Sequence, residues 1–333
     1  MNSAIAIDQT VVDQTAMNQP AMNQPATDQP ATDQPATDQP ATDQDDSMQG
    51  VSADRHRINW ITNLPFLGMH AACLAAFWVR FSWKAVALCA ALYAIRMFGI
   101  TAGYHRYFSH RSYRTSRAFQ FFLAWVGCSA LQKGPLWWAG HHRHHHRHSD
   151  EKGDVHSPLQ SGFWWSHVGW IMSNKYEATD FDIVKDFSQY PELRWLDRYW
   201  AVPGVLLAAA CLSFMGWPGL VWGFFISTVL LYHGTFVTNS LCHMFGRIRY
   251  KTADTSRNSF ILALVTLGEG WHNNHHYYSA SARMGFFWWE IDISYYTLRC
   301  LSLLGLVWDI KKPRDRVLKM SDPRPRIETE YRG

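Results

Sequence analysis

Residues 219–243 read GLVWGFFISTVLLYHGTFVTNSLCH, an apolar run that is followed at once by Asn239 and His243. A helix needs about 20 mostly apolar residues to cross the hydrocarbon core of a bilayer, and residues 219–238 meet that requirement. Three other stretches have a similar length and composition, and they cover residues 60–79, 85–104 and 200–216. The sequence therefore predicts an integral-membrane protein with four helical spans.

The four predicted spans pair into two helical hairpins, because the connections at 80–84 and 215–219 are short. Polar segments rich in His and Arg follow each hairpin, at 105–198 and 239–333. The positive-inside rule places both segments, and both termini, in the cytoplasm. The expected fold class is an all-α integral-membrane protein with four transmembrane helices in two hairpins, capped by a cytoplasmic helical domain.

The N-terminal region differs from the rest of the chain in composition. Residues 16–44 repeat a five-residue unit, first AMNQP and then ATDQP. Proline recurs in nearly every unit and almost nothing apolar is available for a core, so we predict disorder. The expected organisation is a disordered repeat tail (1–52), a membrane domain (53–312) and a basic C-terminal tail (313–333).

The charge of the chain is concentrated in the part that follows the repeats. Residues 1–50 contain eight aspartates and no lysine or arginine, so the rest carries all 31 basic residues and 19 of the 27 acidic ones. A basic body beside membrane spans suits an anionic membrane face, an acidic partner protein or a phosphate-bearing substrate. Nucleic acid is disfavoured, because the basic residues are interleaved with histidines and membrane segments. The six cysteines form no CxxC pair, which argues against a disulfide framework or a zinc site.

Most of the 17 histidines fall in four clusters outside the spans. On a helix, positions 0, +3 and +4 lie within about 100° of one another. His142, His145 and His146 therefore share one face of HHRHHHRH (141–148), whereas His144 and His148 point away from it. The same spacing aligns the histidines of WHNNHH, which are His272, His275 and His276.

Two further clusters follow the second and fourth spans directly. Asn239 and His243 lie one helical turn apart. His105 and His110, in HRYFSH, are five residues apart, or about 140° on an ideal helix. They can bind one ion only if the helix ends or loosens there, or if the ion lies between them. Imidazole is a common metal ligand, and nine histidines at these spacings exceed the needs of one ion and suggest two.

Five motifs in this chain resemble those of the membrane fatty acyl desaturases, specifically the Δ9 type that includes stearoyl-CoA and cyanobacterial acyl-lipid desaturases. They are GITAGYHRYFSHRSY, WWAGHHRHHHRHSDEKGDVHSP, GFWWSHVGW, TNSLCHMFG and GEGWHNNHHYYSASAR. The resemblance covers about residues 58–312 and is highly specific, because the flanking residues match as well as the histidines.

The resemblance implies a di-iron centre and assigns its ligands. One iron would be bound by His105, His110, His142, His146 and His275, and the other by His145, His243, His272 and His276. Asn239 would hold a water on the second iron. His141 and Trp271 would be neighbours of the ligands, and His156 and His167 would have structural roles.

The resemblance also implies the reaction. Reduced iron and O2 would remove two hydrogens from carbons 9 and 10 of a saturated C16 or C18 acyl chain, leaving a cis double bond. Removing hydrogen from an unactivated CH2 needs a redox metal, and zinc has no redox chemistry. The residues after 312 form only a short basic tail, so two electrons would come from a separate ferredoxin or cytochrome b5.

The expected substrate contacts come from residues near the second span and the histidine clusters. They are Lys133, Trp138, Tyr93, Met97 and Phe236. Lys133 and the pair Gly140 and His141 replace residues that contact the CoA head group in animal enzymes, so both acyl-lipid and acyl-CoA substrates stay open. Tyr93 and Met97 lie one helical turn apart, where the family closes the end of its acyl tunnel. A bulky Met97 would favour 16 carbons over 18, unless it only packs between helices.

Two other functions fit parts of the pattern. A lipid hydroxylase, or a desaturase that acts at another carbon, would use the same metal ligands. A membrane metal transporter should place its ligands inside the spans. Only His70 and His233 lie within predicted spans, and neither belongs to a cluster. The transporter is therefore the weaker alternative.

Overall fold

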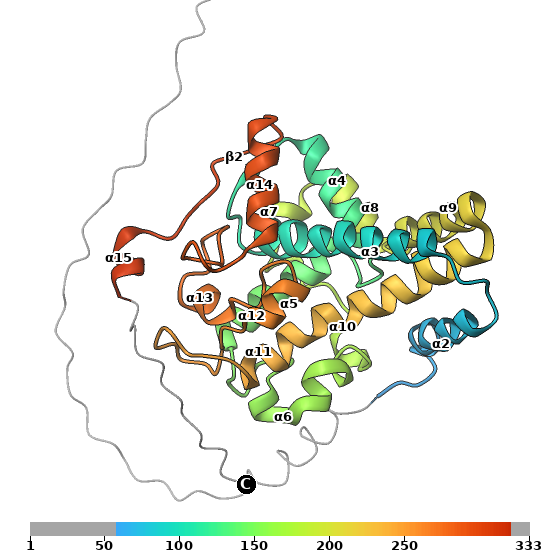
Figure 1. Cartoon of the computed structure of the whole chain (residues 1–333). Helices are drawn as coiled ribbons and strands as arrows, with labels where there is room; N and C mark the ends of the chain where they lie inside the picture. The colour runs from blue at the N-terminus through green and yellow to red at the C-terminus, as the bar shows by residue number, and fades with distance from the viewer. Residues whose placement is uncertain (1–57, 321–333) are drawn as a thin grey trace, which may run out of the picture. The chain divides into compact units, whose positions relative to one another are not determined.

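The computed structural model describes residues 58–320, which form a mainly helical unit (Figure 1). The predicted repeat tail, residues 1–52, lies outside the described residues. The first helical pair comprises α2 (Leu64–Ala72), its 3-10 extension η1 (Cys73–Phe77), α3 (Trp83–Phe98) and a π-helical continuation η2 (Gly99–Ser109). The apolar helix 64–77 is shorter than the span expected at 60–79, whereas Trp83–Ser109 is 27 residues long.

The second helical pair forms a hairpin. Its elements are α9 (Val202–Pro218), η5 (Gly219–Ile226), α10 (Ser227–Asn239) and the short α11 (Leu241–Met244). Gly216 adopts φ 61° and ψ −152°, and the chain reverses there, so that η5 packs against α9 and α3 (Figure 1). A positive φ is readily adopted only by glycine, which explains this residue at the turn.

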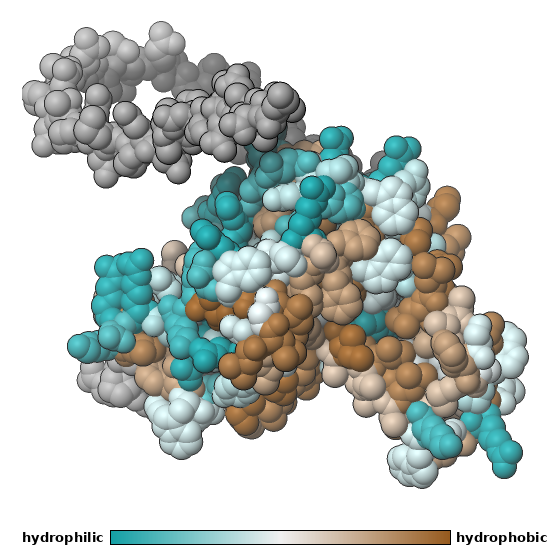
Figure 2. Space-filling view, turned by 90° about the horizontal axis from the view of Figure 1, so that it is seen from above, coloured by the Kyte–Doolittle hydropathy of each residue, from teal (hydrophilic) through white to brown (hydrophobic). Residues whose placement is uncertain are grey.

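Two segments of the described chain are long and apolar enough to cross a membrane, Trp83–Ser109 and Val202–Met244. Large apolar side chains stay exposed near the turns of both helical pairs, with Phe214 of α9 at 86%, Phe77 at the end of η1 at 82% and Trp78 after it at 80%. Figure 2 shows that hydrophobic residues cover much of the part where Figure 1 places α3 and α9. Exposed apolar surface of this extent marks an interaction with lipid or another apolar partner.

Arg96 lies inside α3, yet it is only 1% exposed. Its guanidinium donates to Thr228 Oγ1 (2.7 Å) and Ser227 Oγ (2.5 Å) of α10, and to the carbonyls of Leu92 and Ser129. A buried charge is tolerated only when its donors are satisfied. Arg96 therefore links α3 to α10 and to the backbone at Ser129.

The remaining elements cover one end of the two helical pairs. They are α4 (Arg117–Cys128), α5 (Pro135–His148), α6 (Pro158–Trp164), η3 (Trp165–Gly169), η4 (Asn174–Tyr176), α7 (Lys185–Ser188), α8 (Pro191–Arg198), α12 (Phe260–Val265), α13 (His272–Tyr277), α14 (Ile293–Leu303) and α15 (Asp315–Lys319). Two short strands, β1 (Arg114–Thr115) and β2 (Val307–Trp308), pair antiparallel with Arg114 opposite Trp308. In the predicted tail 313–333, α15 buries Val317 against Tyr250 and Phe286.

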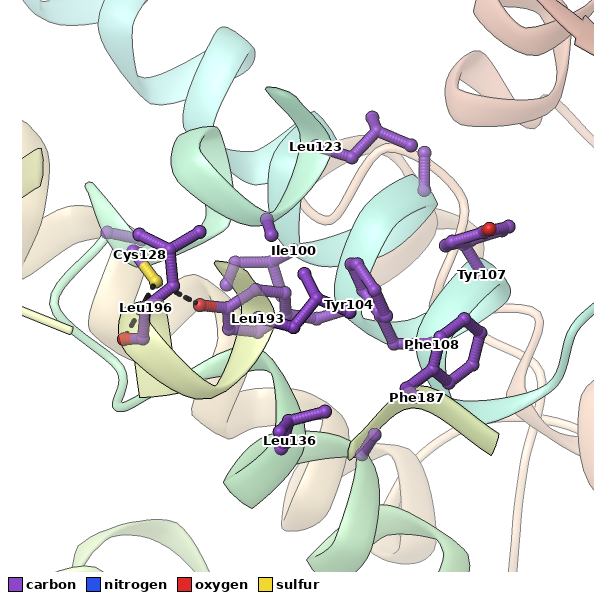
Figure 3. Close-up of a cluster of buried hydrophobic side chains, with 14 of the residues drawn as sticks. Ile100, Tyr104, Tyr107, Phe108, Leu123, Cys128, Leu136, Phe187, Leu193 and Leu196 are labelled. Atoms are coloured by element: carbon purple, nitrogen blue, oxygen red, sulfur yellow. Dashed lines mark hydrogen bonds between the residues drawn. The ribbon is translucent and has the colours of Figure 1, made fainter. Parts of the chain in front are cut away.

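The main core lies where η2 meets these covering helices (Figure 3). Tyr104 and Phe108 of η2 pack with side chains from α4, α5, α7 and α8, including Leu123, Leu136 and Phe187. Close approach requires glycine at Gly127, because a Cβ there would lie 2.2 Å from the Tyr104 ring. The core thus fixes η2 against α4 and α5, and both η2 and α5 carry histidine clusters.

Candidate metal centre

The cluster 141–148 is held by a cap on the N-terminus of α5. The backbone N–H groups of Leu136 and Trp137 both donate to Asp197 Oδ1 (2.9 Å each), which comes from α8. Pro135 occupies the first turn, where its missing N–H costs nothing. The cap fixes the start of α5, and the helix then projects His142, His145 and His146 inward.

His105 and His110 are brought together by the π-helix η2. A π-helix forms i→i+5 hydrogen bonds, and the backbone N–H of His110 donates to the carbonyl of His105 at 3.2 Å. Residues five apart therefore lie about one turn apart, and the two ring centroids are 4.8 Å from each other. The sequence analysis required a loosened helix if His105 and His110 are to bind one ion, and the π-helix η2 provides it.

The third cluster lies on α13, a helix of only six residues that two buried amides hold in place. Asn273 accepts from the backbone N–H groups of Arg249 and Tyr250 (2.8 and 2.7 Å). Asn274 donates to the Met284 carbonyl and to Glu290 (2.9 and 3.0 Å). These bonds fix a short helix that its own backbone bonds stabilise only weakly.

The structure gathers nine histidines into two close groups. One comprises His105, His110, His142, His146 and His275, and the other comprises His145, His243, His272 and His276. Within each group the ring nitrogens that could bind an ion lie within 4.8 Å of one another. These are the two sets that the resemblance assigns to two irons, with His243 of α11 beside the end of α10.

The facing atoms in the first group are the Nε2 nitrogens. Four contacts link them: His105 to His275 (3.0 Å), His275 to His146 (2.9 Å), His146 to His142 (3.0 Å) and His142 to His110 (2.9 Å). In the second group His243 and His272 meet through Nε2 at 3.1 Å. Two nitrogens about 2.1 Å from one ion and at a right angle to each other lie roughly 3.0 Å apart. The spacing suits shared coordination of an ion.

Carboxylates behind the rings fix the orientation of four histidines. His145 Nδ1 donates to Asp154 (2.9 Å), His243 Nδ1 to Asp150 (3.2 Å) and His276 Nδ1 to Asp254 (2.6 Å). The fourth is His105, whose Nδ1 pairs with Glu269, and Glu269 also receives Arg106 (2.9 Å). A ligand histidine usually donates its other N–H to such an acceptor, which leaves its Nε2 lone pair for the metal.

Burial keeps most of these imidazoles neutral. Burial and the neighbouring histidines hold the pKa well below its usual value for His110, His142, His146, His272 and His275. Burial also lowers the pKa of His276 to about 4, against the opposing effect of Asp254. For His145 the nearby Asp154 outweighs burial and raises the pKa. Metal ligands must be deprotonated, so a neutral cluster is ready to bind.

The pKa values of the carboxylates are lowered as well, and for an acid this favours the charged form. Burial acts to raise the pKa values of Asp150, Asp154 and Asp254, but hydrogen bonds and attraction from their histidine partners outweigh it and leave them below the usual value. The same balance, with His105 and Arg106 as partners, lowers the pKa of Glu269. The carboxylates are therefore ionised, and they place negative charge behind a site suited to a cation.

The residues present fit a pair of metal ions. The Nε2 atoms of His145 and His276 are buried and have no hydrogen-bond partner among residues 58–320. A buried polar atom without a partner is costly, and a bound ion would satisfy these two. The donors are imidazoles throughout, which suit iron, zinc, copper or nickel better than calcium or magnesium.

Several histidines that were not expected to bind metal lie outside the two groups. His144 donates to the Gly153 carbonyl (2.9 Å), and its ring lies tilted against that of His148, with centroids 4.7 Å apart. His141 donates to the Trp137 carbonyl (2.9 Å). His156 is close to His145 and Asp154, with which it forms a third group. Trp271, the expected neighbour of the ligands, donates its indole N–H to Ile291.

Asn239 lies on the wall of two cavities. The smaller, of about 30 Å³, is lined by Asn239, by Met97 and Trp138, and by histidines of both groups. That volume holds one or two waters. The larger, of about 340 Å³, is also lined by Asn239, and it extends past Lys133, Trp138 and Phe236 toward α2 and α9. The two cavities share Trp138, His142, Thr235 and Asn239 and are therefore adjacent.

Four of the five expected substrate residues line one or both of these cavities, and Tyr93 does not. Lys133, Trp138 and Phe236 line the larger cavity, and Met97 with Trp138 lines the smaller one. Tyr93 is not among the residues that line either cavity, and its hydroxyl donates to the Val265 carbonyl (2.7 Å). It packs behind Met97, where both face Gly234 of α10.

Sequence reasoning missed the carboxylates that orient the histidines. Asp150 and Asp154 lie shortly after the HHRHHHRH run, and Glu269 precedes His272 by three residues. An acid beside each histidine cluster was a signal for such pairing. The pairings themselves could not be predicted in most cases. Asp154 is nine residues from its partner His145, but Asp254 and Asp150 orient histidines 22 and 93 residues away.

Comparisons with known proteins identify the family of this chain. A family model described as fatty acid desaturase matches residues 81–299. An sn-1 stearoyl-lipid 9-desaturase of Anabaena variabilis is 40% identical over 263 residues, covering 78% of this chain and 96% of that protein. An sn-2 palmitoyl-lipid 9-desaturase of Nostoc sp. (strain 36) is 39% identical over 75% of this chain and 89% of that protein. An acyl-CoA 5-desaturase of Anemone leveillei is 40% identical over 74% of this chain and 78% of that protein.

The orienting carboxylates generate a prediction about metal content. Asp154→Asn removes the charge behind His145, and loss of such a partner typically weakens metal binding about 10–100-fold. We expect the purified variant to carry less metal than the wild type, measured by mass spectrometry of the eluted metals. Glu151→Gln is the control. Glu151 is 70% exposed, and its partner His148, 3.8 Å away, belongs to neither histidine group. Equal metal contents in the wild type and both variants would contradict the role of Asp154.

Proposed function

Because the chain belongs to the fatty acid desaturase family, and is therefore an oxidoreductase that introduces a double bond into an acyl chain, we propose that it is a membrane Δ9 desaturase of C16 and C18 acyl chains. The observation that carries the proposal is the pair of histidine groups at the end of a cavity lined by apolar and aromatic side chains. The stearoyl-lipid and palmitoyl-lipid 9-desaturases named above support the position of the double bond.

The proposed arrangement in the membrane is four spans in two hairpins, with the histidine groups and both termini on the cytoplasmic side. The two long apolar segments and the exposed aromatic side chains near the turns of both helical pairs support it. The helix 64–77 is short for a span, but residues 58–63 extend its apolar surface, with Trp60 at 61% and Ile61 at 79% exposed. The hairpin turn at Gly216 supports the division of Val202–Met244 into two spans.

The nine histidines would hold two irons, divided as the two groups, and Asn239 would hold a water in the small cavity between them. Bound iron would supply the redox chemistry that couples O2 to the oxidation of an unactivated CH2 group. The chain's own part is to hold the imidazoles neutral, to orient them through Asp150, Asp154, Asp254 and Glu269, and to keep the site nearly closed to bulk water.

The acyl chain would lie in the larger cavity and end in the smaller one. Trp138 and Asn239 line both, and Trp138 stacks on His142 with centroids 5.0 Å apart. These contacts would place one stretch of the acyl chain beside the metal centre. Positioning of this kind makes one carbon pair the preferred target.

A lipid-linked acyl chain fits the larger cavity better than acyl-CoA does. Its walls carry one lysine, Lys133, and one glutamate, Glu177, and Lys133 already lies over the Trp200 ring at 5.6 Å. The several phosphate charges of CoA would need more cations than this lining offers. The cavity also extends to Phe66 and Met69 of α2 and Val205 of α9, which belong to apolar helices. An acyl-lipid could therefore enter from the membrane.

Complementation of a desaturase-deficient host tests the proposed function. Expression of the chain should restore a Δ9 cis double bond in membrane-lipid acyl chains, located by mass spectrometry after feeding labelled palmitate. His142→Ala, which removes a central imidazole of the first group, should abolish it. A hydroxylated product, a double bond at another carbon, or a product found only in the acyl-CoA pool would contradict the corresponding part of the proposal.

Met97 should set the length of the acyl chain. It is 1% exposed and lines the small cavity beside histidines of both groups. Met97→Ala would deepen the cavity, so we expect the ratio of 18-carbon to 16-carbon monounsaturated products to rise, measured by gas chromatography. Ile95→Ala is the control, because Ile95 is on the same helix but 53% exposed. An unchanged ratio with a lower Tm would mean that Met97 only packs between helices.

The electrons would come from a ferredoxin or cytochrome b5 that docks beside His110. Arg111 follows His110 and is 66% exposed, and the backbone N–H of Lys311 donates to the Ser112 carbonyl (2.9 Å). Lys312 and Arg314 continue this exposed basic surface. An acidic carrier would be attracted to it, and the first histidine group lies directly behind.

Reversal of one charge tests this docking surface. Lys312→Glu should raise the KM for a soluble ferredoxin or cytochrome b5 several-fold at low salt, with the difference shrinking as ionic strength rises. Lys175→Glu is the control, because Lys175 is exposed and lies on η4. Equal effects of the two substitutions on KM would show that the carrier docks elsewhere.

A further inference from the structure

One side of α12 is apolar, and no other part of the chain between residues 58 and 320 covers it. All six side chains of this helix are apolar. Ala263 faces inward and is buried, and Ile261 on the other side is 73% exposed. The exposed side chains of α12 are Phe260, Ile261, Leu264 and Val265. An exposed apolar surface without a polar residue marks a contact with lipid or another apolar partner.

This exposed side continues into the loop before α14. The Trp271 ring lies 6.3 Å from that of Phe260, and its indole N–H donates to the Ile291 carbonyl (2.8 Å). Ile291 is itself exposed, as are Trp288 at 82% and Trp289. Tryptophan is enriched where hydrocarbon meets the lipid headgroups. The exposed side chains of α12, Trp288, Trp289 and Ile291 together are called the α12 surface.

A hydrogen bond to α3 gives the depth of this surface along a membrane span. The Tyr93 hydroxyl donates to the Val265 carbonyl (2.7 Å). Tyr93 lies ten residues, or about 15 Å of helix rise, after Trp83 at the start of α3. Trp83 is 77% exposed, as is typical of a tryptophan at a bilayer boundary. The hydrocarbon core is about 30 Å thick, so α12 meets α3 within the hydrocarbon layer.

The end of α12 is also suited to a place without water. The last four carbonyls of a helix have no partner within it, and in lipid each must be satisfied by the protein. The Leu262 carbonyl accepts the backbone N–H of Thr266 (2.9 Å), and the Ala263 carbonyl accepts that of Gly268 (2.7 Å). With Tyr93 on Val265, three of the four carbonyls have donors from the protein.

The inner side of α12 supports the metal centre. The backbone N–H of Ser259 donates to the Gly270 carbonyl (2.7 Å), and the backbone N–H of Gly270 donates to Thr266 Oγ1 (3.1 Å). Thr266 and Glu269 line the small cavity, and Glu269 pairs with His105. The segment between α12 and α13 is therefore fixed to α12, and whatever contacts the α12 surface lies directly behind the site.

We propose that the α12 surface is embedded in the cytoplasmic leaflet and contacts lipid acyl chains, with Trp288 and Trp289 at the headgroup boundary. The inference rests on the proposed function, to whose four spans it adds a membrane contact that does not cross the bilayer. Short apolar elements of this kind lie in the plane of the interface. The contact fixes the depth of the histidine groups in the leaflet from which a lipid-linked acyl chain enters.

A second copy of this chain is the competing occupant. A stable protein–protein interface has an apolar centre and a polar rim, and it covers about 800 Å² on each partner. The α12 surface has no polar rim toward the spans, because α3 and α10 beside it also expose apolar side chains, Ile95 and Leu230 at 53% each (Figure 1). Continuity with the lipid-facing spans favours lipid.

A fluorophore attached to Ile261→Cys tests the contact. The protein would be reconstituted in vesicles of phosphatidylcholine and phosphatidylglycerol, in a Cys300→Ser background because Cys300 is exposed. Leu206→Cys of α9, 53% exposed, is the reference within a span, and Glu151→Cys, 70% exposed, is the reference in water. Nitroxide-bearing lipids should quench the label at Ile261 as strongly as at Leu206. Iodide should quench it several-fold less than at Glu151.

The other results would overturn the inference. Iodide quenching equal to that at Glu151 would place the α12 surface in water, and weak quenching by both agents would mean that protein covers it, as a second copy would. If Ile261→Cys loses its fold, Leu264→Cys on the same side decides by the same criteria. Iodide quenching at Leu206 would contradict the proposed spans instead. None of these readings needs bound iron or activity, so a chain that makes no double bond would leave them valid.

Discussion

The convergence of nine imidazole nitrogens in a buried space is the constraint on which the rest of this structure depends. Lone pairs that face one another at about 3 Å repel unless a cation lies between them, and burial makes that repulsion stronger. Ionised carboxylates behind His105, His145, His243 and His276 hold these rings in that orientation and add negative charge, which a bound cation would offset. Desolvation and the neighbouring imidazoles keep most of the rings neutral, which is the form that binds metal. The facing lone pairs that destabilise the site without a cation are therefore the same groups that would bind a metal ion.

The backbone around the site serves that convergence. A π-helix brings residues five apart onto one side, an acid from α8 caps the start of α5, and two buried amides hold the short α13. Each of these features gives up regular helical bonding or buries a polar group, and each is compensated by a specific partner. These three features lie where the ligands are, whereas the apolar core beside them packs α4, α5 and α8 in the ordinary way.

Polar side chains inside the apolar helices also depend on specific hydrogen-bond partners. Arg96 is tied to two hydroxyls and two carbonyls, so that every part of its guanidinium has an acceptor, and it fastens α3 to α10. His233 of α10 lies 3.2 Å from His70 of α2 and 3.0 Å from His167 of η3, so it joins these elements in a similar way. In each case a polar side chain inside an apolar helix fixes neighbouring elements through hydrogen bonds.

The sequence by itself determined the family, the helical character and the clusters that supply the ligands. The family, the enzyme class and desaturase activity are confirmed by the comparisons, since the motifs that carry them are local in sequence. Helical spacing alone aligned His142, His145 and His146 and set His144 and His148 apart, because all five lie on one regular helix. The pairing of His105 with His110 could not be derived, because it depends on a π-helix that an ideal helix does not anticipate. The tertiary structure alone showed that Asp254 orients His276, that Tyr93 lies behind the cavity wall, and that His70, His233 and His167 touch, because these contacts join residues far apart in the chain.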